Sequence, residues 1–563
     1  MPSLTKKIVN GKPYYYLREC RRVNGRPKIV WTVYLGSPQA LLERLTRPEP
    51  QRVDLFEFGA SAAAYAIASS LDLVATIDRH VPKQGAQGPS VGEYLLLAAL
   101  NRCVAPRSKA RIHDWYGKTV LRRLVPMTEA QLASQRFWDN MDRVSPEQIV
   151  AIERDLAKTA VERFKLDLQG LLFDATNFYT FVDSFNHRST LPQRGHSKEG
   201  RANLRIIGLA LLVTADGDVP LFHQTYAGNQ HDAVTFRSSI QEIADRCRNL
   251  AQGACDITLV FDKGNNAEDN LESAAKGPFH FVGSLVPTHH RKLLAIPRSK
   301  MTRLRQDLLP SVWAIRKHQE VFGVRRLVLC TYNRPLYTTQ RKTLRREIGT
   351  RRRKLERLRA SLERARERAR GKAPTLEGTR NRIDAILRGR HMKDLFRTKI
   401  SKGSDGFPRL TFEFREKAWV KLSNTLLGKT ILFTDREDWT DEQIVLAYRG
   451  QAHVEAAFRR MKDPRFLTFR PMHHWTDQKL RVHALYCVLA LMILSLLRRQ
   501  LEQQGIHLSI ARMMDKLSEI REVALLYPGP GGATAEPFHR TTVSTLDAEQ
   551  QTLFDALKLR RFL

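Results

Sequence analysis

The sequence predicts a mixed α/β protein in which strand-rich and helical stretches follow one another in blocks. Three observations lead to this prediction. β-branched and aromatic residues alternate with basic ones near the N-terminus, Ala- and Leu-rich stretches follow up to about residue 165, and short apolar runs separated by turns occupy residues 166–286. We expect several domains, because 563 residues exceed the roughly 100–200 residues of an ordinary domain.

The composition indicates an intracellular protein with a polyanionic partner. The chain contains 93 Lys and Arg against 58 Asp and Glu, a formal net charge of +35, and its hydrophobic content of 42% excludes a wholly disordered basic tail. Its six cysteines form no CxxC pair, so neither a disulfide framework nor a zinc finger is predicted. The first residues lack an apolar signal segment, and the apolar stretch Ala484–Leu497 is shorter than the roughly 17–25 residues that cross a membrane. We therefore expect a cytoplasmic protein that does not enter the membrane.

Two different modules are predicted at the N-terminus. In residues 1–50, the turn pairs Asn10-Gly11 and Asn24-Gly25 interrupt the alternating pattern, which predicts a small basic β-meander. In residues 51–165, stretches such as ASAAAYAIASSLDLV and EYLLLAALNRCV predict helices. Because the chain is so basic, we interpret residues 51–165 as a helical DNA-binding domain.

The remaining chain predicts a central sheet interrupted by a large insertion. Residues 166–290 follow the order β-β-β-α-β-α-β, which indicates the first part of a mixed sheet. Residues 291–435 form the insertion, residues 436–500 the last part of the core, and residues 501–563 a C-terminal helical region. We expect the apolar helix at about 482–497 to pack on the sheet.

The insertion contains a basic helix over residues 341–372. It holds 15 Lys and Arg against four acids, and its leucines and alanines recur at spacings of three and four, so an amphipathic helix with a narrow apolar seam is predicted. This seam could pair with the segment around Ile383, Ile386 and Leu387 as an antiparallel hairpin, or with a second protomer. We favour the hairpin within one chain.

Three acids stand out as candidates for chemistry, namely Asp174, Asp262 and Glu455. Each aspartate follows an apolar strand-like run, and the glutamate lies in a predicted helix. Side chains at strand ends emerge from a rigid sheet edge, and divalent magnesium or manganese prefers oxygen ligands from several elements. The alternative for each aspartate is a turn or a helix cap.

The third acid lies in a helix that we expect to begin near Thr440 and to end at Pro464. Tyr448, Glu455 and Lys462 are spaced by seven residues, so on one continuous helix they form a single stripe. Arg459 lies near the same stripe, while Val454, Phe458 and Met461 form the opposite, apolar face. Such a helix could hold a metal ion and bind DNA phosphates, or it could be an ordinary exposed ion-pair face.

At these motifs the chain resembles a known family. The segments FDATNF around Asp174, LVFDKGNN around Asp262 and YRGQAHVEAAFRRMKD around Glu455 resemble the bacterial DD(E) insertion-sequence transposases, in particular the branch whose third motif reads Tyr-x2-Arg-x3-Glu-x6-Lys. The likeness covers about residues 166–497. The family's arginine would fall at Gln451, and the arginine present is Arg449.

This resemblance implies a ribonuclease-H-like catalytic core in which Asp174, Asp262 and Glu455 are the catalytic and metal-binding residues. It also implies two Mg²⁺ or Mn²⁺ ions that promote cleavage of element ends and strand transfer to target DNA. We expect DNA-binding roles for a set of basic and polar residues: Tyr448, Arg449, Arg459, Lys462, Lys198, Arg201, Asn203 and Lys263.

The resemblance further implies double-stranded DNA as the partner and a homodimer on DNA, because two element ends must be handled together. A bacterial, nucleoid-associated location is expected with it. Two other functions stay open from the sequence: a metal-dependent endonuclease without strand transfer, and a catalytically inactive DNA-binding protein that uses only its charge.

Overall fold

A computed structural model gives the fold of the chain and describes residues 2–23, 26–46, 50–83, 85, 87–201, 203–250, 256–265, 270, 272, 277–368, 373–470, 472–527 and 538–563. The chain forms two compact units. The first unit comprises Met1–Asp167, Ala175–Gln230 and Glu455–Leu563, and the second comprises Leu168–Asp174 and His231–Val454. Each unit is therefore built from segments that are distant in the sequence.

The N-terminal β-meander is confirmed. Strands β1 (Pro2–Val9), β2 (Lys12–Val23) and β3 (Arg26–Gly36) pair in antiparallel order, and helix α1 (Pro38–Thr46) follows. Asn10 and Gly11 both have positive φ, 50° and 76°, as a tight two-residue hairpin turn requires. The second Asn-Gly pair, residues 24–25, lies outside the described residues.

Helices dominate the rest of the N-terminal region, as expected. Their bounds are α2 (Gly59–Ser70), α3 (Leu73–His80), α4 (Val91–Val104), η1 (Lys109–Arg111), α5 (Ile112–Tyr116), α6 (Leu121–Leu124), α7 (Ser134–Asp142) and α8 (Pro146–Phe164). Capping boxes at Ser90 and Ser145 begin α4 and α8.

Helix α18 (Asp477–Glu502) is the core of the first unit. It is long and apolar enough to cross a membrane, but 94% of its most apolar window is buried inside the protein. It packs on strand β7 of the sheet, as we expected, but also on α2, α4, α7 and α8. The expectation that this helix only covers the sheet is therefore incomplete. Because α18 is apolar on all sides, it is buried against helices as well as against the sheet.

The prediction of an all-helical C-terminal region is wrong. Residues 501–563 contain helices α19 (Ile510–Glu519) and α20 (Ala548–Ala556), the short helix η5 (Leu559–Phe562), and also strands β16 (Arg521–Tyr527) and β17 (Phe538–Val543). Strand β16 pairs with both β17 and β4 (Arg52–Glu57), so the region described as helical from residue 51 also begins with a strand. These strands are six or seven residues long, and such short runs carry little periodicity.

The large mixed sheet is confirmed. In the second unit its strands lie in the order β10-β11-β12-β15-β9-β8-β5, and in the first unit β6 and β7 follow the end of β5. The strands are β5 (Gly170–Tyr179), β6 (Ile206–Thr214), β7 (Pro220–Ala227), β8 (Thr258–Phe261), β9 (His280–Leu285), β10 (Thr302–Arg303), β11 (Val312–Val321), β12 (Val324–Asn333) and β15 (Lys429–Thr434). Strand β8 pairs in parallel with both β5 and β9. The following pairs of this sheet are antiparallel: β6 with β7, β9 with β15, β15 with β12, β12 with β11, and β11 with β10.

Helical elements connect these strands. Helix α9 (Asp232–Leu250) joins β7 to β8, and η2 (Lys263–Asn265) follows β8. Most of the helix expected between β8 and β9 lies outside the described residues. The elements η3 (Pro287–His289), α11 (Arg291–Leu294) and η4 (Arg298–Lys300) lead from β9 to β10, so the inserted strands β11, β12 and β15 extend the same sheet.

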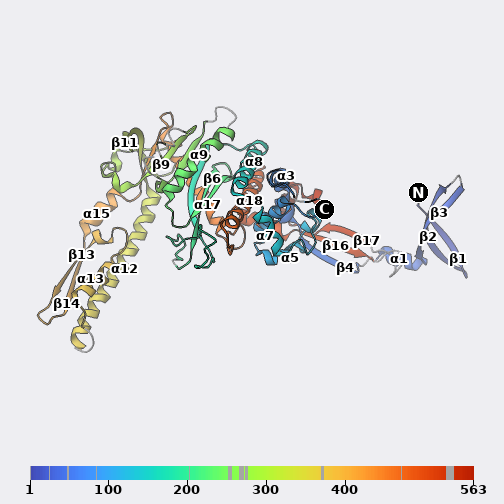
Figure 1. Ribbon diagram of the computed structural model, residues 1–563, viewed down its shortest axis with the longest axis horizontal. Helices are drawn as coiled ribbons and strands as arrows, with labels where there is room; N and C mark the ends of the chain where they lie inside the picture. The colour runs from blue at the N-terminus through green and yellow to red at the C-terminus, as the bar shows by residue number, and fades with distance from the viewer. Residues whose placement is uncertain are drawn as a thin grey trace. The chain divides into compact units, whose positions relative to one another are not determined.

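The predicted basic hairpin is confirmed within the second unit. Helix α12 (Arg334–Arg368) lies along α13 (Leu376–Ile386) and the strands β13 (Phe396–Lys402) and β14 (Pro408–Phe414), next to α14 (Met392–Leu395) and α15 (Glu416–Thr425) (Figure 1). One apolar cluster joins these elements and includes Leu355, Leu358, Leu362, Ile383 and Leu387. The apolar seam is therefore buried inside one chain, while residues 369–372 of the predicted helix lie outside the described residues.

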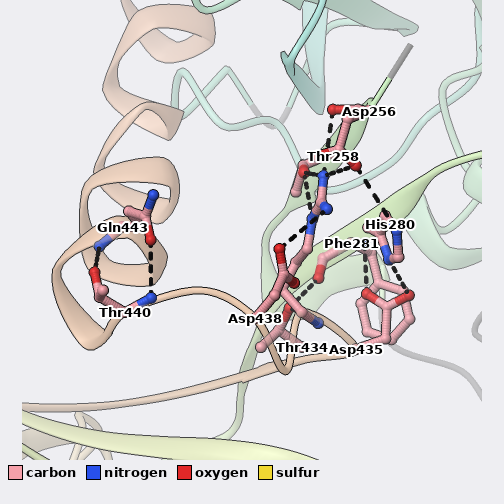
Figure 2. Close-up of polar contacts among 10 residues, drawn as sticks. Asp256, Thr258, His280, Phe281, Thr434, Asp435, Asp438, Thr440 and Gln443 are labelled. Carbon is pink, nitrogen blue, oxygen red and sulfur yellow. Dashed lines mark hydrogen bonds and ion pairs between the residues drawn. The ribbon is translucent and has the colours of Figure 1, made fainter. Parts of the chain in front are cut away.

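A polar network holds the starts of β8 and β9 to the end of β15. Thr434 donates a hydrogen bond to the carbonyl of Phe281 (2.5 Å), and the backbone N–H of Phe281 donates to Asp435 (2.9 Å; Figure 2). The buried guanidinium of Arg436 donates to the Thr258 hydroxyl (2.9 and 3.1 Å) and pairs with Asp256 (2.5 Å). This network fixes the strand β8 at the end opposite to Asp262.

Candidate active site

Two aspartates lie on neighbouring strands: Asp262 directly follows β8, as expected, whereas Asp174 is the fifth residue of β5 and not at a strand end, because β5 continues to Tyr179. Strand β5 pairs with the parallel strand β8 in a register that ends at Phe173 opposite Phe261. Asp174 directly follows Phe173, and Asp262 directly follows Phe261. Both aspartates are half-buried. Neighbouring strands lie about 4.8 Å apart and residues in register point to the same face of the sheet. Both carboxylates therefore emerge at the same place within the second unit.

The carboxylate of Asp262 is fixed by its surroundings. The hydroxyls of Ser284 and Tyr448 donate hydrogen bonds to its Oδ1 atom, at 2.8 and 3.0 Å, and the Lys263 ammonium lies 3.6 Å from Oδ2. Partial burial raises the pKa of Asp262, but the backbone N–H and charge of Lys263 and the two hydroxyls outweigh it and hold the pKa below its usual value. Asp262 is thus ionised and oriented, as a ligand for a divalent cation must be.

The helix that carries the third acid is interrupted at Gly450, so the prediction of one continuous helix from Thr440 to Pro464 is wrong. The chain forms α16 (Asp441–Arg449), which begins with the expected Thr440–Gln443 capping box, and then α17 (Gln451–Met461). Tyr448 belongs to α16, Glu455 to α17, and Lys462 follows the end of α17.

Glycine at position 450 allows the break to approach the sheet. A Cβ atom there would lie 2.8 Å from the carbonyl oxygen of Ala447 and 3.1 Å from the side chain of Leu172 on β5. The Gln451 side chain then donates a hydrogen bond to the carbonyl of Phe173 (3.3 Å), the residue that precedes Asp174. The residue that stands in place of the family's arginine thus ties the start of α17 to β5.

Helix α17 presents Glu455 and Arg459 as exposed side chains, and Arg449 on α16 is exposed as well. Its opposite face, with Val454, Phe458 and Met461, is buried as expected. Glu455 lies one helical turn after Gln451. Within the described part of the chain, no group of three or more His, Cys, Asp or Glu is arranged around a possible metal position, and the role of Glu455 stays a prediction.

Two of the predicted phosphate-binding lysines dock on β5 just beyond Asp174, within the first unit. The ammonium of Lys198 donates to the carbonyl of Ala175 (2.7 Å), and that of Lys462 donates to the hydroxyl of Thr176 (2.9 Å). Arg201 lies over the ring of Tyr179 at 5.6 Å, and Asn203 is exposed. The loop and the helix end that carry these cations therefore converge on one strand.

A cavity of about 680 Å³ adjoins Asp262 in the second unit. Lys263, Ser284 and Tyr448 line it on the side of the aspartate, and Arg390 and residues of α12 line it toward the insertion. The insertion thus contributes walls to the space beside Asp262.

Sequence reasoning missed Ser284 and, although it noted Gln451, did not predict the contact that Gln451 makes with β5. Ser284 is the fifth residue of β9 and is almost fully buried, and only its partner Asp262 distinguishes it from an ordinary strand serine. The contact of Gln451 could have been found from its position, because this residue replaces the arginine that the third motif leads one to expect.

Comparison with known proteins agrees with the resemblance. The family model described as Transposase DDE domain matches residues 166–493. Among solved structures, the chain is similar to the piggyBac transposase synaptic complex with hairpin DNA, determined by cryo-EM. The TM-score is 0.37 at 7% sequence identity, over 81% of this chain and 79% of that chain. None of the curated proteins matches.

Proposed function

Because the chain belongs to the family of transposases with a DDE domain, we propose that this DNA transposase acts for a bacterial insertion sequence by cutting the element ends and joining them to target DNA. The observation that carries the proposal is the pair Asp174 and Asp262, which the register of β5 and β8 sets side by side. Paired carboxylates at a rigid sheet edge suit the in-line displacement of a phosphodiester.

The residues fit the divalent ions that the family generally uses. Two neighbouring carboxylates, one of them ionised and hydrogen-bonded, provide the hard oxygen ligands that Mg²⁺ and Mn²⁺ prefer. We propose that Asp174, Asp262 and Glu455 hold two such ions, which when bound activate the attacking water or 3′-hydroxyl and stabilise the leaving oxygen.

The other residues of the site bind and orient. Tyr448 and Ser284 hold the Asp262 carboxylate in one position, so that little reorganisation is needed when DNA arrives. Lys263, Lys198 and Lys462 place positive charge next to the two aspartate-bearing strands, where they bind the phosphates that flank the scissile bond. Arg449, Arg459, Arg201 and Asn203 are exposed and add further phosphate contacts.

Two further parts of the proposal concern assembly and location. A net charge of +35 favours binding of double-stranded DNA and thus a nucleoid-associated protein in the bacterial cytoplasm. A homodimer forms on DNA, because the two ends of an element must be cut and joined together.

The test measures both cleavage and joining by the full-length chain. Its substrate is a supercoiled plasmid that carries the DNA flanking the coding sequence, incubated with Mg²⁺ or with EDTA. We expect cleaved ends and joined products with Mg²⁺, neither product with EDTA, and losses of at least 10³-fold for Asp174→Asn, Asp262→Asn and Glu455→Gln. The matched control is Asp54→Asn, an exposed aspartate of β4 that pairs with Arg52 at 2.9 Å.

Each other outcome contradicts a named part of the proposal. Cleavage without joined products would identify a metal-dependent endonuclease. DNA binding with no metal-dependent product at all would identify a catalytically inactive binding protein. Full activity of Glu455→Gln together with inactive aspartate variants would remove the glutamate from the site.

A further inference from the structure

The first unit contains a second cavity, of about 550 Å³, in which buried cations and exposed aromatic rings meet. It is formed by the end of α4, the element η1, α7, the segment 473–476 and the start of α18. Among the described residues, its lining includes Arg102, Lys109, Arg188 and Lys479 but no aspartate or glutamate. The cavity is therefore electropositive and suited to an anion.

Lys109 is the strongest reason to expect an anionic ligand. Its side chain lines the cavity and is only 8% exposed, and its ammonium lies over the faces of Tyr486 (4.1 Å) and Phe137 (5.8 Å). Within the described residues, no carboxylate or other acceptor pairs with this ammonium. Burial and the neighbouring Arg102 lower the pKa of Lys109 well below its usual value. Burial without a counter-ion therefore holds this side chain toward its neutral form, and an anion in the cavity would stabilise the charged form.

Arg102, near the end of α4, is a second buried cation at this cavity. It is 2% exposed, and its Nη1 atom donates to the carbonyls of Thr468 and Arg470 at 3.3 Å, while its buried Nε atom has no hydrogen-bond partner within the described structure. Backbone carbonyls do not neutralise a guanidinium. Lys479, by contrast, is paired with Asp142 at 2.6 Å, so among the described cations of the lining it is Arg102 and Lys109, both buried, that lack a counter-charge inside the protein.

The histidines at this cavity do not provide the counter-charge. His483 donates from Nε2 to the carbonyl of Phe469 (2.7 Å), because a carbonyl can only accept. Its Nδ1 atom then accepts from the hydroxyl of Tyr486 (2.5 Å) and from Nε2 of His474 (3.2 Å). Burial and the cations Lys109 and Arg102 lower the pKa of His474 to about 3, so both rings are neutral.

Two tryptophans supply apolar faces at the same cavity. Trp475 is 60% exposed and Trp138 is 37% exposed, although both line the cavity wall. The backbone at Trp475 is fixed, since the Asn186 side chain donates to its carbonyl at 2.9 Å. Exposed indole rings beside a cationic pocket are surfaces on which a nucleobase stacks.

We propose that this cavity binds a nucleoside phosphate, with the phosphate against Lys109 and Arg102 and the base against Trp475 and Trp138. Its volume lies in the range of about 300–1,000 Å³ of small-molecule sites. The phosphate supplies the negative charge that is missing next to Lys109 and Arg102. The exposed indole rings are the reason to expect that the ligand also carries a base. The same chemistry is offered by a free nucleotide and by the phosphorylated end of an unpaired DNA strand.

The test is a binding measurement on the full-length chain in EDTA, which suppresses cleavage. Deoxyadenosine 5′-monophosphate is titrated by calorimetry and by tryptophan fluorescence, next to inorganic phosphate. We expect the nucleotide to bind at least tenfold more tightly than phosphate. Lys109→Met should weaken nucleotide binding about tenfold or more, and Trp475→Ala about fivefold or more, with Trp475→Phe restoring most of the loss.

The matched control is Lys158→Met, a change on α8 at an exposed lysine that lies 3.9 Å from Glu162. It should leave nucleotide binding unchanged. Trp475 is exposed, so its replacement leaves the fold intact even if Lys109→Met does not fold, and the thermal unfolding temperature of each variant verifies this. Asp174→Asn should bind the nucleotide like the unchanged protein, which separates this site from the proposed catalytic one.

Competition identifies the source of the phosphate. A 5′-phosphorylated single-stranded decamer that displaces the nucleotide assigns the site to a DNA end, whereas a decamer that does not displace it assigns the site to a free nucleotide. The proposal is overturned if the mononucleotide does not bind, if inorganic phosphate binds equally well, or if Lys158→Met weakens binding as much as Lys109→Met.

Discussion

Replacing Tyr448 by phenylalanine tests how the position of Asp262 is maintained. The change removes only the hydroxyl that donates to Oδ1 at 3.0 Å and leaves the Ser284 hydrogen bond and the Lys263 charge in place. A hydrogen bond to a charged group contributes about 1.5–3 kcal/mol. The Asp262 side chain is 40% exposed, so water replaces part of the loss, and we expect about 1 kcal/mol. That free energy corresponds to about a fivefold slower cleavage step.

The pH dependence distinguishes this positioning role from a general loss of structure. Tyr448 is one of the groups that lower the pKa of Asp262, so its removal raises that pKa. A carboxylate with a lowered pKa contributes its stabilisation above the unfolded pKa and loses it as the pH falls through the folded pKa. The acidic limb of the cleavage rate should therefore move to higher pH in Tyr448→Phe.

The assay is single-turnover cleavage from pH 4.5 to 8, compared with Tyr337→Phe. Tyr337 on α12 makes a similar hydroxyl contact, 3.1 Å from the Ser423 hydroxyl, away from the aspartates. We expect the control to keep both the rate and the acidic limb. If Tyr448→Phe gives the unchanged rate and pH profile, the hydroxyl does not position Asp262 and this reasoning is refuted.

Three other substitutions test the packing at Gly450, in the insertion and on strand β4. Gly450→Ala places a Cβ atom 2.8 Å from the Ala447 carbonyl oxygen and 3.1 Å from the Leu172 side chain. We expect the free energy of unfolding to fall by about 1–3 kcal/mol and DNA cleavage to become slower. An unchanged unfolding temperature would contradict the close approach. Leu358→Ala creates a cavity in the apolar cluster of the insertion and should lower the free energy of unfolding by about 2–5 kcal/mol, measured by denaturant unfolding. Proteolysis within residues 334–414 should also become faster, and a proteolysis rate equal to that of the unchanged protein would count against this prediction. Burial raises the pKa of Glu57 to about 7, so its contribution to stability is present below pH 4.5 and is lost as the pH rises through 7, by up to about 3 kcal/mol. Glu57→Gln should flatten this dependence between pH 5 and 8, and a slope equal to that of the unchanged protein would refute the assignment.

Patterns that act over short distances predicted much of the fold. The Asn10-Gly11 pair gave the first hairpin, the Thr440–Gln443 pair the start of α16, and the apolar runs the strands β5 to β9 in their order along the chain. The seam of α12 predicted its packing with α13, because leucines at spacings of three and four must be buried against a neighbour. In each case the signal lies within the element itself or in its immediate neighbours along the chain.

The features that the sequence did not predict depend on contacts between distant segments. Strand β4 finds β16 more than 460 residues later, and neither short strand is recognisable alone. The interruption at Gly450 lies where the backbone comes close to Leu172 of β5, and the sequence does not signal it, since glycine inside a helical pattern is otherwise tolerated. The strands β11, β12 and β15 extend the sheet of β8 and β9, although the insertion was expected to form a region of its own.

The net charge predicted a polyanionic partner but not which cations face it. Some cations are buried and hydrogen-bonded inside the protein. Arg436 donates to Thr258 of β8, and Lys429 donates to the carbonyls of Leu294 and Ile296, so both stabilise the sheet and cannot contact DNA. Arg449 and Arg459 are exposed and remain available to phosphates. Neutralising an exposed cation should therefore weaken DNA binding and reduce its salt dependence, whereas neutralising a buried one should lower stability first. A decrease in binding after Lys429→Met, without a decrease in stability, would contradict this division of the charge.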